Sequence, residues 1–362
     1  MGKKRRILFY LAAGIFLAWF AWLVLTPHEP VYQGKPLSVW LEEANESEVV
    51  DYDSANPEAV NAIRQIGIKA LPELVRLVAT KDTGLRKILL KLNEKQSFYS
   101  FQVHSLYECD NMAAAGFYIL GSEAKTAVPE LMVLLSDEDP EVRSSAAWCL
   151  GLIGPTAKDA VPALITAIGT NHSFGDILSG SLALGKIGPE ANAAIPFLRL
   201  LPNDDPNWLI PPIIQAALVQ IGGDSISPYI DQLKDTSNRT NWIRAARIIG
   251  LCPNDADPAI PLLIAGLANT NRGIVWSALH NLGYIHKQPD VCIPAIIPFL
   301  QSPDIILRKE SVVTLHKFGT ASKVASPEII LCLTDPEFAV RVKATNALRD
   351  IDPEAAAKAG IK

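Results

Sequence analysis

Residues 141–168 read EVRSSAAWCLGLIGPTAKDAVPALITAI. The stretch predicts two helices, because alanine and larger apolar residues recur at helical spacing on both sides of a glycine and a polar turn. Pro162 interrupts the second apolar run. A proline near the start of a helix costs little, since its missing N–H would be unpaired in the first turn anyway. Pro162 therefore marks the beginning of a helix.

Prolines in the same setting recur along the chain. Motifs of the type A-[VI]-P-x-L, and looser copies of it, place prolines at Pro72, Pro129, Pro162, Pro196, Pro228, Pro261, Pro294 and Pro327. The successive intervals are 57, 33, 34, 32, 33, 33 and 33 residues. Each proline helix leads through a turn of Asp, Asn and Pro into an alanine-rich second helix. Two-helix units of about 33 residues cannot bury an apolar face alone, so the sequence predicts an all-α solenoid of stacked units.

The stretch DEDPEVRSSAAWCLGLIGPTAKDAVPAL, residues 137–164, resembles a HEAT-like repeat of the phycocyanobilin-lyase type. The matching positions are a turn Asp, a Val-Arg pair, a Gly and the A-V-P-x-L motif, found at Asp139, Val142 and Arg143 and again at Asp335, Val340 and Arg341. The resemblance covers roughly residues 57–352 and implies a right-handed α-solenoid of about eight repeats. It is specific for the fold and implies no activity. VYQGKPLSVWLEE, residues 31–43, is similar to a segment of membrane-anchored bacterial HEAT-repeat proteins of unknown function.

The first 25 residues differ in composition from the rest of the chain. Residues 1–6 include four basic side chains, and residues 7–25, ILFYLAAGIFLAWFAWLVL, carry no charge. At ~1.5 Å per residue this run extends roughly 30 Å, enough to cross the hydrocarbon core of a bilayer. A cleaved signal peptide is the alternative, but the run is longer than a usual h-region and no clear small-x-small site follows it. We therefore expect one transmembrane helix over residues 7–25.

Basic residues predict the orientation of that helix. Four precede the span, and only Lys35 lies within the twenty residues after it. Because Lys and Arg are retained on the cytoplasmic side, the N-terminus is expected in the cytoplasm and the repeat domain outside it. In a bacterium this corresponds to a single-pass protein of the inner (plasma) membrane whose repeats face the periplasm.

The remaining boundaries follow from the repeat. Residues 26–56 are expected to be a juxtamembrane linker and capping segment, and residues 57–352 the solenoid. The interval from Pro72 to Pro129 exceeds the repeat by 24 residues, which places an insertion at about residues 80–110. Such insertions often form binding loops, and the alternative is an extra helix that covers the end of the stack. Residues 353–362 are expected to form a C-terminal cap.

Charge and cysteine content exclude some functions. Beyond residue 25 the chain has 29 basic and 38 acidic side chains, a surface that repels phosphate backbones. No basic stripe is evident outside the first six residues, so nucleic acid is not an expected partner. The five cysteines are far apart and form no C-x-x-C pair, which argues against a zinc site. Most lie in apolar helical segments as small hydrophobic residues, and a disulfide stays possible.

Motifs for catalysis are weak. GSLALGKI, residues 180–187, fits G-x4-G-K, but Ile187 stands where a P-loop needs Ser or Thr, and no strand is predicted before it. Some HEAT-repeat proteins bind iron through repeated His-Glu pairs, whereas this sequence has one such pair, His28-Glu29. His280 and His286 are six apart and do not share a helix face as an i, i+4 pair would. We expect no cofactor, no metal and no enzyme activity.

Four aromatic residues form the candidate ligand-binding set. They are Phe174, Trp208, Trp242 and Trp276, each 34 residues from the next. Second helices line the concave surface of HEAT-type stacks, so the rings are candidates for an aromatic stripe that binds a peptide or glycan. The alternative is that each ring fills an interface between repeats. When Gly250 is aligned with Gly151, Trp242 stands where the family pattern has Arg143.

These patterns favour a membrane-tethered, extracytoplasmic scaffold that binds a protein or peptide partner through its solenoid surface without catalysis. The alternative is an enzyme or lyase-like accessory subunit that cradles a bulky hydrophobic ligand. A third hypothesis is a mechanical spacer in the cell envelope.

Overall fold

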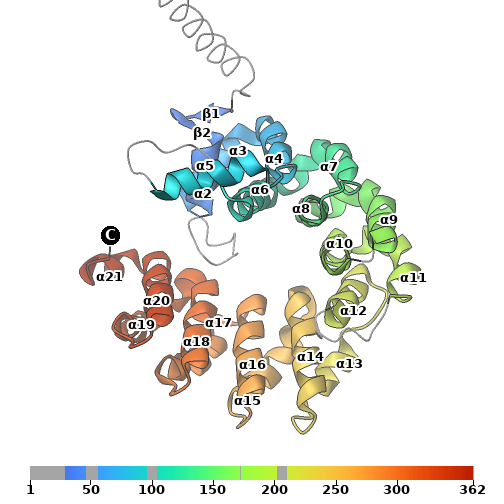
Figure 1. The fold of residues 1–362 in the computed structure, drawn as a ribbon. Coiled ribbons are helices and arrows are strands. Elements are labelled where there is room, and N and C mark those ends of the chain that lie inside the picture. The colour runs from blue at the N-terminus through green and yellow to red at the C-terminus, as the bar shows by residue number, and fades with distance from the viewer. Residues whose placement is uncertain (1–28, 46–55, 96–103, 172, 202–209, 362) are drawn as a thin grey trace, which may run out of the picture.

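A computed structural model describes residues 29–45, 56–95, 104–171, 173–201 and 210–361. Helices follow one another in an open arc, with two layers of helices across its width (Figure 1). Apart from one short hairpin, every regular element of the described residues is helical. The all-α solenoid predicted from the proline spacing is thus confirmed.

An outer row of eight helices carries the repeated prolines in the described residues. In seven of them the proline is the second residue, so its missing N–H costs no hydrogen bond. Pro294 is the exception, because it lies inside its helix, which changes to a 3-10 turn at Ile297. The outer helices are α4 (Leu71–Val78), α7 (Val128–Leu134), α9 (Val161–Asn171), α11 (Ile195–Leu198), α13 (Ser227–Gln232), α15 (Ile260–Leu267), α17 (Pro289–Ile296) and α19 (Ser326–Cys332).

An inner row of eight helices follows the concave side of the arc in the same residues (Figure 1). Each helix of this row contacts the next one along the chain. The row therefore forms one continuous surface. The inner helices are α6 (Leu106–Leu120), α8 (Pro140–Ile153), α10 (Phe174–Ile187), α12 (Ile210–Ile221), α14 (Arg239–Leu251), α16 (Arg272–Ile285), α18 (Ile305–Lys317) and α20 (Phe338–Ile351).

Helix ends carry the polar and glycine residues that the sequence places there. Asp139 begins α8 by accepting from the N–H of Glu141 at 3.0 Å, and Asp304 does the same for Ile306 in α18 at 2.8 Å. Gly154 ends α8 with φ of 76°, a conformation that favours glycine. Five inner helices, α6, α8, α10, α14 and α18, lead into 3-10 turns, and two further turns follow α3 (Pro57–Ile66) and the outer helix α17. The turns are η2 (Gly67–Ala70), η3 (Gly121–Ala127), η4 (Gly154–Ala160), η5 (Gly188–Ala194), η6 (Pro253–Asp255), η7 (Asp257–Ala259), η8 (Ile297–Gln301) and η9 (Gly319–Ala325).

A small N-terminal unit covers the first end of the stack. Strands β1 (Val31–Tyr32) and β2 (Lys35–Pro36) pair antiparallel and lead into α2 (Leu37–Ala44). The side chain of Glu29 accepts from the N–H of Ser38 in the first turn of α2 at 2.9 Å. Helix α2 buries Trp40 and packs on α3 (Pro57–Ile66) and on α6.

Two further helices lie outside the regular pattern. The insertion contributes α5 (Gly84–Lys95), and α21 (Pro353–Lys358) follows the last inner helix. Arg86 of α5 donates to the Cys109 sulfur at 2.9 Å, which ties the insertion to α6. The expected basic segment 1–6 and transmembrane helix 7–25 lie outside the described residues. Among the residues that are described, no helix is long and apolar enough to cross a membrane.

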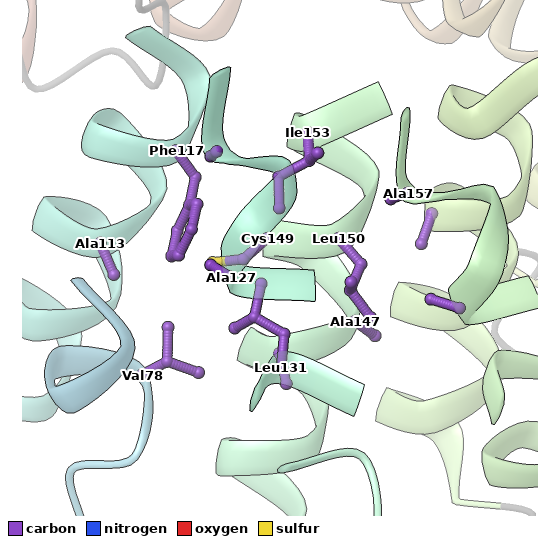
Figure 2. Packing of buried hydrophobic residues seen from close by; sticks show 14 of the residues in the cluster. Val78, Ala113, Phe117, Ala127, Leu131, Ala147, Cys149, Leu150, Ile153 and Ala157 are labelled. Carbon is purple, nitrogen blue, oxygen red and sulfur yellow. The ribbon is translucent and has the colours of Figure 1, made fainter. Parts of the chain in front are cut away.

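The core lies between the two rows. Figure 2 shows Phe117 of α6, Leu131 of α7 and Cys149 of α8 packed together, and each is at most 1% exposed. Burying a side chain of this size contributes about 1.5–3 kcal/mol, and the contribution recurs at every repeat.

All five cysteines are buried and free, so the disulfide that the sequence left open does not form. Burial raises the pKa of the Cys252 thiol to about 12 and of the Cys292 thiol to about 11. These thiols are therefore unreactive at neutral pH.

Candidate functional site

Arg143 links two repeats from inside the structure. Its guanidinium makes two parallel hydrogen bonds to Asp176 of the next repeat, at 3.0 and 2.8 Å, and donates to the carbonyls of Asp137 and Glu138. Both ionic side chains are buried. Hydrogen bonding to Asp176 raises the pKa of Arg143. Its ionic partner is thus Asp176 and not the turn residue Asp139 that precedes α8.

Arg308 and Arg341 repeat this arrangement in the C-terminal repeats. Each donates through Nη1 to the carbonyls five and six residues before it, as Arg143 does. Arg308 also makes two hydrogen bonds to Asp335, at 2.8 and 3.0 Å. The family arginine therefore fixes the turn between outer and inner helices and has a structural role.

Trp242 occupies the position of Arg143 in α14 and does not line a groove. Its side chain is 0% exposed, and its Nε1 donates to the carbonyl of Leu233 at 3.0 Å, at the end of the preceding outer helix. A methyl group added at Gly266 of α15 would lie 2.6 Å from the indole. The expectation that Trp242 binds a ligand is wrong, because the ring fills the space between repeats and replaces the arginine's hydrogen bond to the turn.

The other three aromatic candidates do not form one stripe either. Phe174 is 44% exposed at the start of α10, Trp276 is half-buried, and Trp208 lies outside the described residues. Relative to the glycine near the end of each inner helix, Phe174, Trp242 and Trp276 stand eleven, eight and seven residues earlier. One residue rotates a side chain by about 100° around a helix, so equal spacing along the chain does not place these rings on one face.

Trp276 instead belongs to an aromatic row along α16 itself. The rings of Trp276 and His280 stack at 4.6 Å with an interplanar angle of 22°, and His280 meets Tyr284 at 4.8 Å. Spacing of four residues places all three on one side of the helix. We call Trp276, His280 and Tyr284 the α16 aromatic row.

The α16 aromatic row faces the inside of the arc. Ala278 of the same helix contacts Gly266 of the outer helix α15. His280 is two residues further on, a rotation of about 200°, and therefore points away from the outer row. Tyr284 is 45% exposed, and the His280 side chain is 30% exposed. The row presents its rings to solvent on the concave side.

Glu310 of α18 holds this row in place. One carboxylate oxygen accepts from the Trp276 Nε1 at 3.0 Å, and the other pairs with the His280 Nδ1 at 2.8 Å. Glu310 itself is buried, at 8% exposure. Because a carboxylate accepts, the Nδ1 of His280 is the donor in this contact. Glu310 thus orients both rings.

Cations flank the row on the neighbouring helices. The Lys317 ammonium of α18 lies 3.3 Å from the centroid of the Tyr284 ring, a cation–π contact. On α14, partial burial lowers the pKa of Arg247, and the Tyr284 hydroxyl partly offsets this. Arg247 and Lys317 are called the basic flank.

The charge of the inner row changes sign along the arc. Inner helices α6, α8, α10 and α12 contain two basic and four acidic residues, whereas α14, α16, α18 and α20 contain ten basic and two acidic. The ten are Arg239, Arg244, Arg247, Arg272, Arg308, Lys309, Lys317, Arg341, Lys343 and Arg349, and the two are Glu310 and Asp350. None of the ten is fully buried. Arg272 and Arg308 pair with Asp304 and Asp335, and Arg341 donates to turn carbonyls, so the count alone does not place these cations on one surface. The expectation that no basic stripe exists beyond the N-terminus therefore stays a prediction.

Sequence reasoning missed His280, Tyr284, Glu310 and the basic flank. The signal was present as Trp276, His280 and Tyr284 at four-residue spacing in one helix. Histidines were compared only with each other, and aromatic residues only between repeats. Glu310 could not be found this way, since its partners lie 30 and 34 residues away.

Other candidate sites are weaker. GSLALGKI lies within α10 as expected, with Gly180 and Ser181 buried. Within the described residues, no three His, Cys, Asp or Glu side chains are grouped so as to hold a metal. A pocket of 320 Å³ lies between α12, α13 and α14, and includes Tyr229, whose hydroxyl donates to Gln215 at 2.6 Å. Burial raises the pKa of that hydroxyl.

Comparison with known proteins finds one matching family model. Residues 110–176, from within α6 to the first turn of α10, match the family model for HEAT repeats. A search of curated proteins found no match.

Three similar solved structures share 17–22% identity with the chain. An engineered protein is 22% identical over 64% of this chain and 97% of its own, with a TM-score of 0.31. Human deoxyhypusine hydroxylase in complex with glycerol is 17% identical over 80% and 99%, with a TM-score of 0.35. The complex of CpcE and CpcF of phycocyanin lyase from Nostoc sp. PCC7120 is 17% identical over 90% and 98%, with a TM-score of 0.36. Similarities at this level carry no argument about function.

Proposed function

We propose that the protein is a non-catalytic scaffold that binds a protein or peptide partner on the concave surface of an eight-repeat, right-handed solenoid. The observation that supports it is the α16 aromatic row, which is ordered by Glu310 and open to the inside of the arc. Extended concave surfaces of this kind suit binding through many weak contacts.

Rigidity favours the row as the centre of such an interface. Trp and Tyr supply large contact area with few rotatable bonds, and they dominate the energy of many protein interfaces. Here Trp276 and His280 lose little further freedom on binding, because both rings are already hydrogen-bonded to Glu310.

In-cell photo-cross-linking tests this proposal. A photoreactive phenylalanine analogue at Tyr284 is compared with the same residue at Leu331, which is 61% exposed on the outer helix α19. A discrete adduct from position 284 and none from 331, identified by mass spectrometry as one protein, is the expected result. Equal adducts from both positions, or none from 284, would contradict the scaffold.

We also propose that residues 7–25 anchor the chain in the inner membrane, with residues 1–6 in the cytoplasm and the repeats in the periplasm. The support is the uncharged run and the four basic residues before it. Protease added to spheroplasts should digest the repeat domain while a cytoplasmic marker stays intact. Full protection of the repeats would overturn this orientation.

A further inference from the structure

We infer that helix α5 of the insertion lies on the membrane surface, with Ile88 and Leu92 in contact with the bilayer. The inference rests on the proposal that residues 7–25 anchor the chain, and it gives the insertion a partner, a lipid surface. Three observations carry it: the exposed apolar face of α5, the lysines beside that face and the short distance from the anchor.

Helix α5 carries apolar side chains that the protein leaves uncovered. Ile88 is 57% exposed and Leu92 is 43% exposed. None of the α5 side chains in the described part of the chain is buried. Among the described residues, no other element packs extensively along this helix. Exposed apolar side chains gathered on one helix indicate a surface that binds something outside the protein.

Arg86 shows which side of α5 points away from the solenoid. Its guanidinium donates to the His104 carbonyl and to the Cys109 sulfur, so Arg86 points towards α6. Ile88 is two residues further on, a rotation of about 200°, and Leu92 lies one turn beyond Ile88 on nearly the same side. Both apolar side chains therefore point away from the repeats and can contact a surface outside them.

Lysines border this apolar face. Lys87 and Lys91 are exposed and each stands one residue before Ile88 or Leu92, so the two pairs form adjacent lines along the helix. Lys87 pairs with Asp82 at 2.9 Å, which leaves Lys91 as the lysine best placed to reach a headgroup phosphate. Lysine side chains can lie along apolar surface and extend their ammonium into the polar layer. Lysines beside an apolar line are typical of helices that lie in a membrane interface.

The position of the anchor selects a bilayer as the partner. The proposed span ends at Leu25, four residues before Glu29, the first described residue. A fully extended chain of four residues covers at most roughly 14 Å. The N-terminal unit is therefore the part of the repeat domain that the anchor holds close to the membrane.

Printed contacts lead from the start of this unit to α5. Glu29 accepts from the N–H of Ser38 in α2 at 2.9 Å, and Glu42 near the other end of α2 lies 3.4 Å from the His104 Nε2. The His104 carbonyl in turn accepts from Arg86 of α5. Figure 1 shows α5 beside α2 at this end of the arc. The outward face of α5 thus belongs to the same unit as the anchor's attachment.

Site-directed spin labelling of the full-length protein in liposomes tests the inference. Leu92→Cys carries the label, and Leu331→Cys is the control, because Leu331 is 61% exposed on the outer helix α19. The five native cysteines are buried, so only the introduced thiol should react, and labelling of the wild type checks this. The liposomes contain phosphatidylcholine and phosphatidylglycerol.

The label at position 92 should be more accessible to dissolved oxygen, which enters the bilayer, than to a water-soluble nickel chelate. The label at position 331 should show the opposite preference. Equal access of the chelate to both positions would overturn the inference. Protection of position 92 from both reagents, as a second copy or another protein would cause, would also overturn it.

A charge on the apolar face provides a matched variant. Ile88→Glu, combined with the label at position 92, should reverse the preference in favour of the chelate, because a charged side chain does not enter the apolar part of a bilayer. Val133→Glu is the control, since Val133 is 74% exposed on the outer helix α7 and should leave position 92 unchanged. Thermal melting confirms that both variants fold. No change in Ile88→Glu, or an equal change in Val133→Glu, would contradict the contact.

Flotation of the liposomes separates this outcome from that of the anchor. Wild-type protein that does not float with the liposomes would reject the anchor and the inference together. Protein that floats, but whose position 92 stays accessible to the chelate, would keep the anchor and reject only the contact of α5 with the bilayer.

Discussion

The two halves of the inner row share one backbone plan and differ in charge. Helices α6 to α12 carry two basic and four acidic residues, and helices α14 to α20 carry ten and two. In both halves some cations pair with carboxylates away from solvent, as Arg143 does with Asp176 and Arg308 with Asp335, and others are exposed, as Lys186 and Arg247 are. Positions that stack the helices are constrained, whereas exposed positions can vary in charge.

The same contrast appears at a single position. Arg143 in α8 and Trp242 in α14 both lie eight residues before a glycine. Arg143 donates hydrogen bonds to two carbonyls of the preceding turn, and Trp242 donates to the Leu233 carbonyl at the end of α13. Arg143 fills the position with a cation paired to Asp176, and Trp242 fills it with an apolar ring. The position is therefore structural in both halves, and function has to be sought on other faces of the helices.

Removing Trp242 should give the largest loss of stability. Trp242→Ala leaves a cavity and an unpaired carbonyl at Leu233, and the free energy of unfolding should fall by about 3–5 kcal/mol. Urea unfolding followed by circular dichroism measures it. Phe174→Ala is the control, because that ring is 44% exposed and should cost less than about 1 kcal/mol. Equal losses would show that Trp242 is not an interior residue.

Breaking the buried ion pair of the first half should come next. Arg143→Met leaves the Asp176 carboxylate buried without its cation, at a cost of about 3 kcal/mol. Arg308→Met in the second half should cost less, because the side chains of Arg308 and Asp335 are 14% and 7% exposed, against 9% and 2% for Arg143 and Asp176. Chemical denaturation of both variants compares them. A greater loss for Arg308→Met would reverse the proposed difference between the halves.

The pH dependence of the second half should follow Asp335. Hydrogen bonding to Arg308 lowers the pKa of Asp335. The carboxylate therefore stabilises the fold above its unfolded pKa of about 3.9, and this stability is lost as the pH falls through the lower folded value. Asp335→Asn should unfold at lower urea than the wild type at pH 7 but at similar urea near pH 2. A constant difference across this range would contradict the assignment.

Cation–π contacts should give the smallest effects. Lys317→Met and Lys186→Met each remove an ammonium from an aromatic ring near the surface, and each should cost about 0.5 kcal/mol. Melting temperatures of the two variants should be nearly equal. A melting temperature that falls strongly in only one variant would show that its lysine stabilises the fold by more than the cation–π contact.

The spacing of proline and glycine predicted the fold, since each residue type acts locally on its own helix end. Pro162 and Gly154 need no distant partner to start or stop a helix, so their 33-residue recurrence could be interpreted directly. Pro294 differs from the other repeat prolines, because α17 already begins at Pro289 and Pro294 therefore lies inside it. The 34-residue spacing of Phe174, Trp242 and Trp276 did not predict a shared face, because the direction of a side chain depends on its position within its own helix.

The sequence by itself determined the all-α repeat, the two-helix unit and the apolar positions of the core, because periodicity specifies which face of each helix must be buried. Tertiary structure alone decided that Trp242 is interior and that Glu310 joins two rings of the preceding helix. These features depend on contacts between residues about 33 positions apart, and their geometry is set only once the helices have stacked.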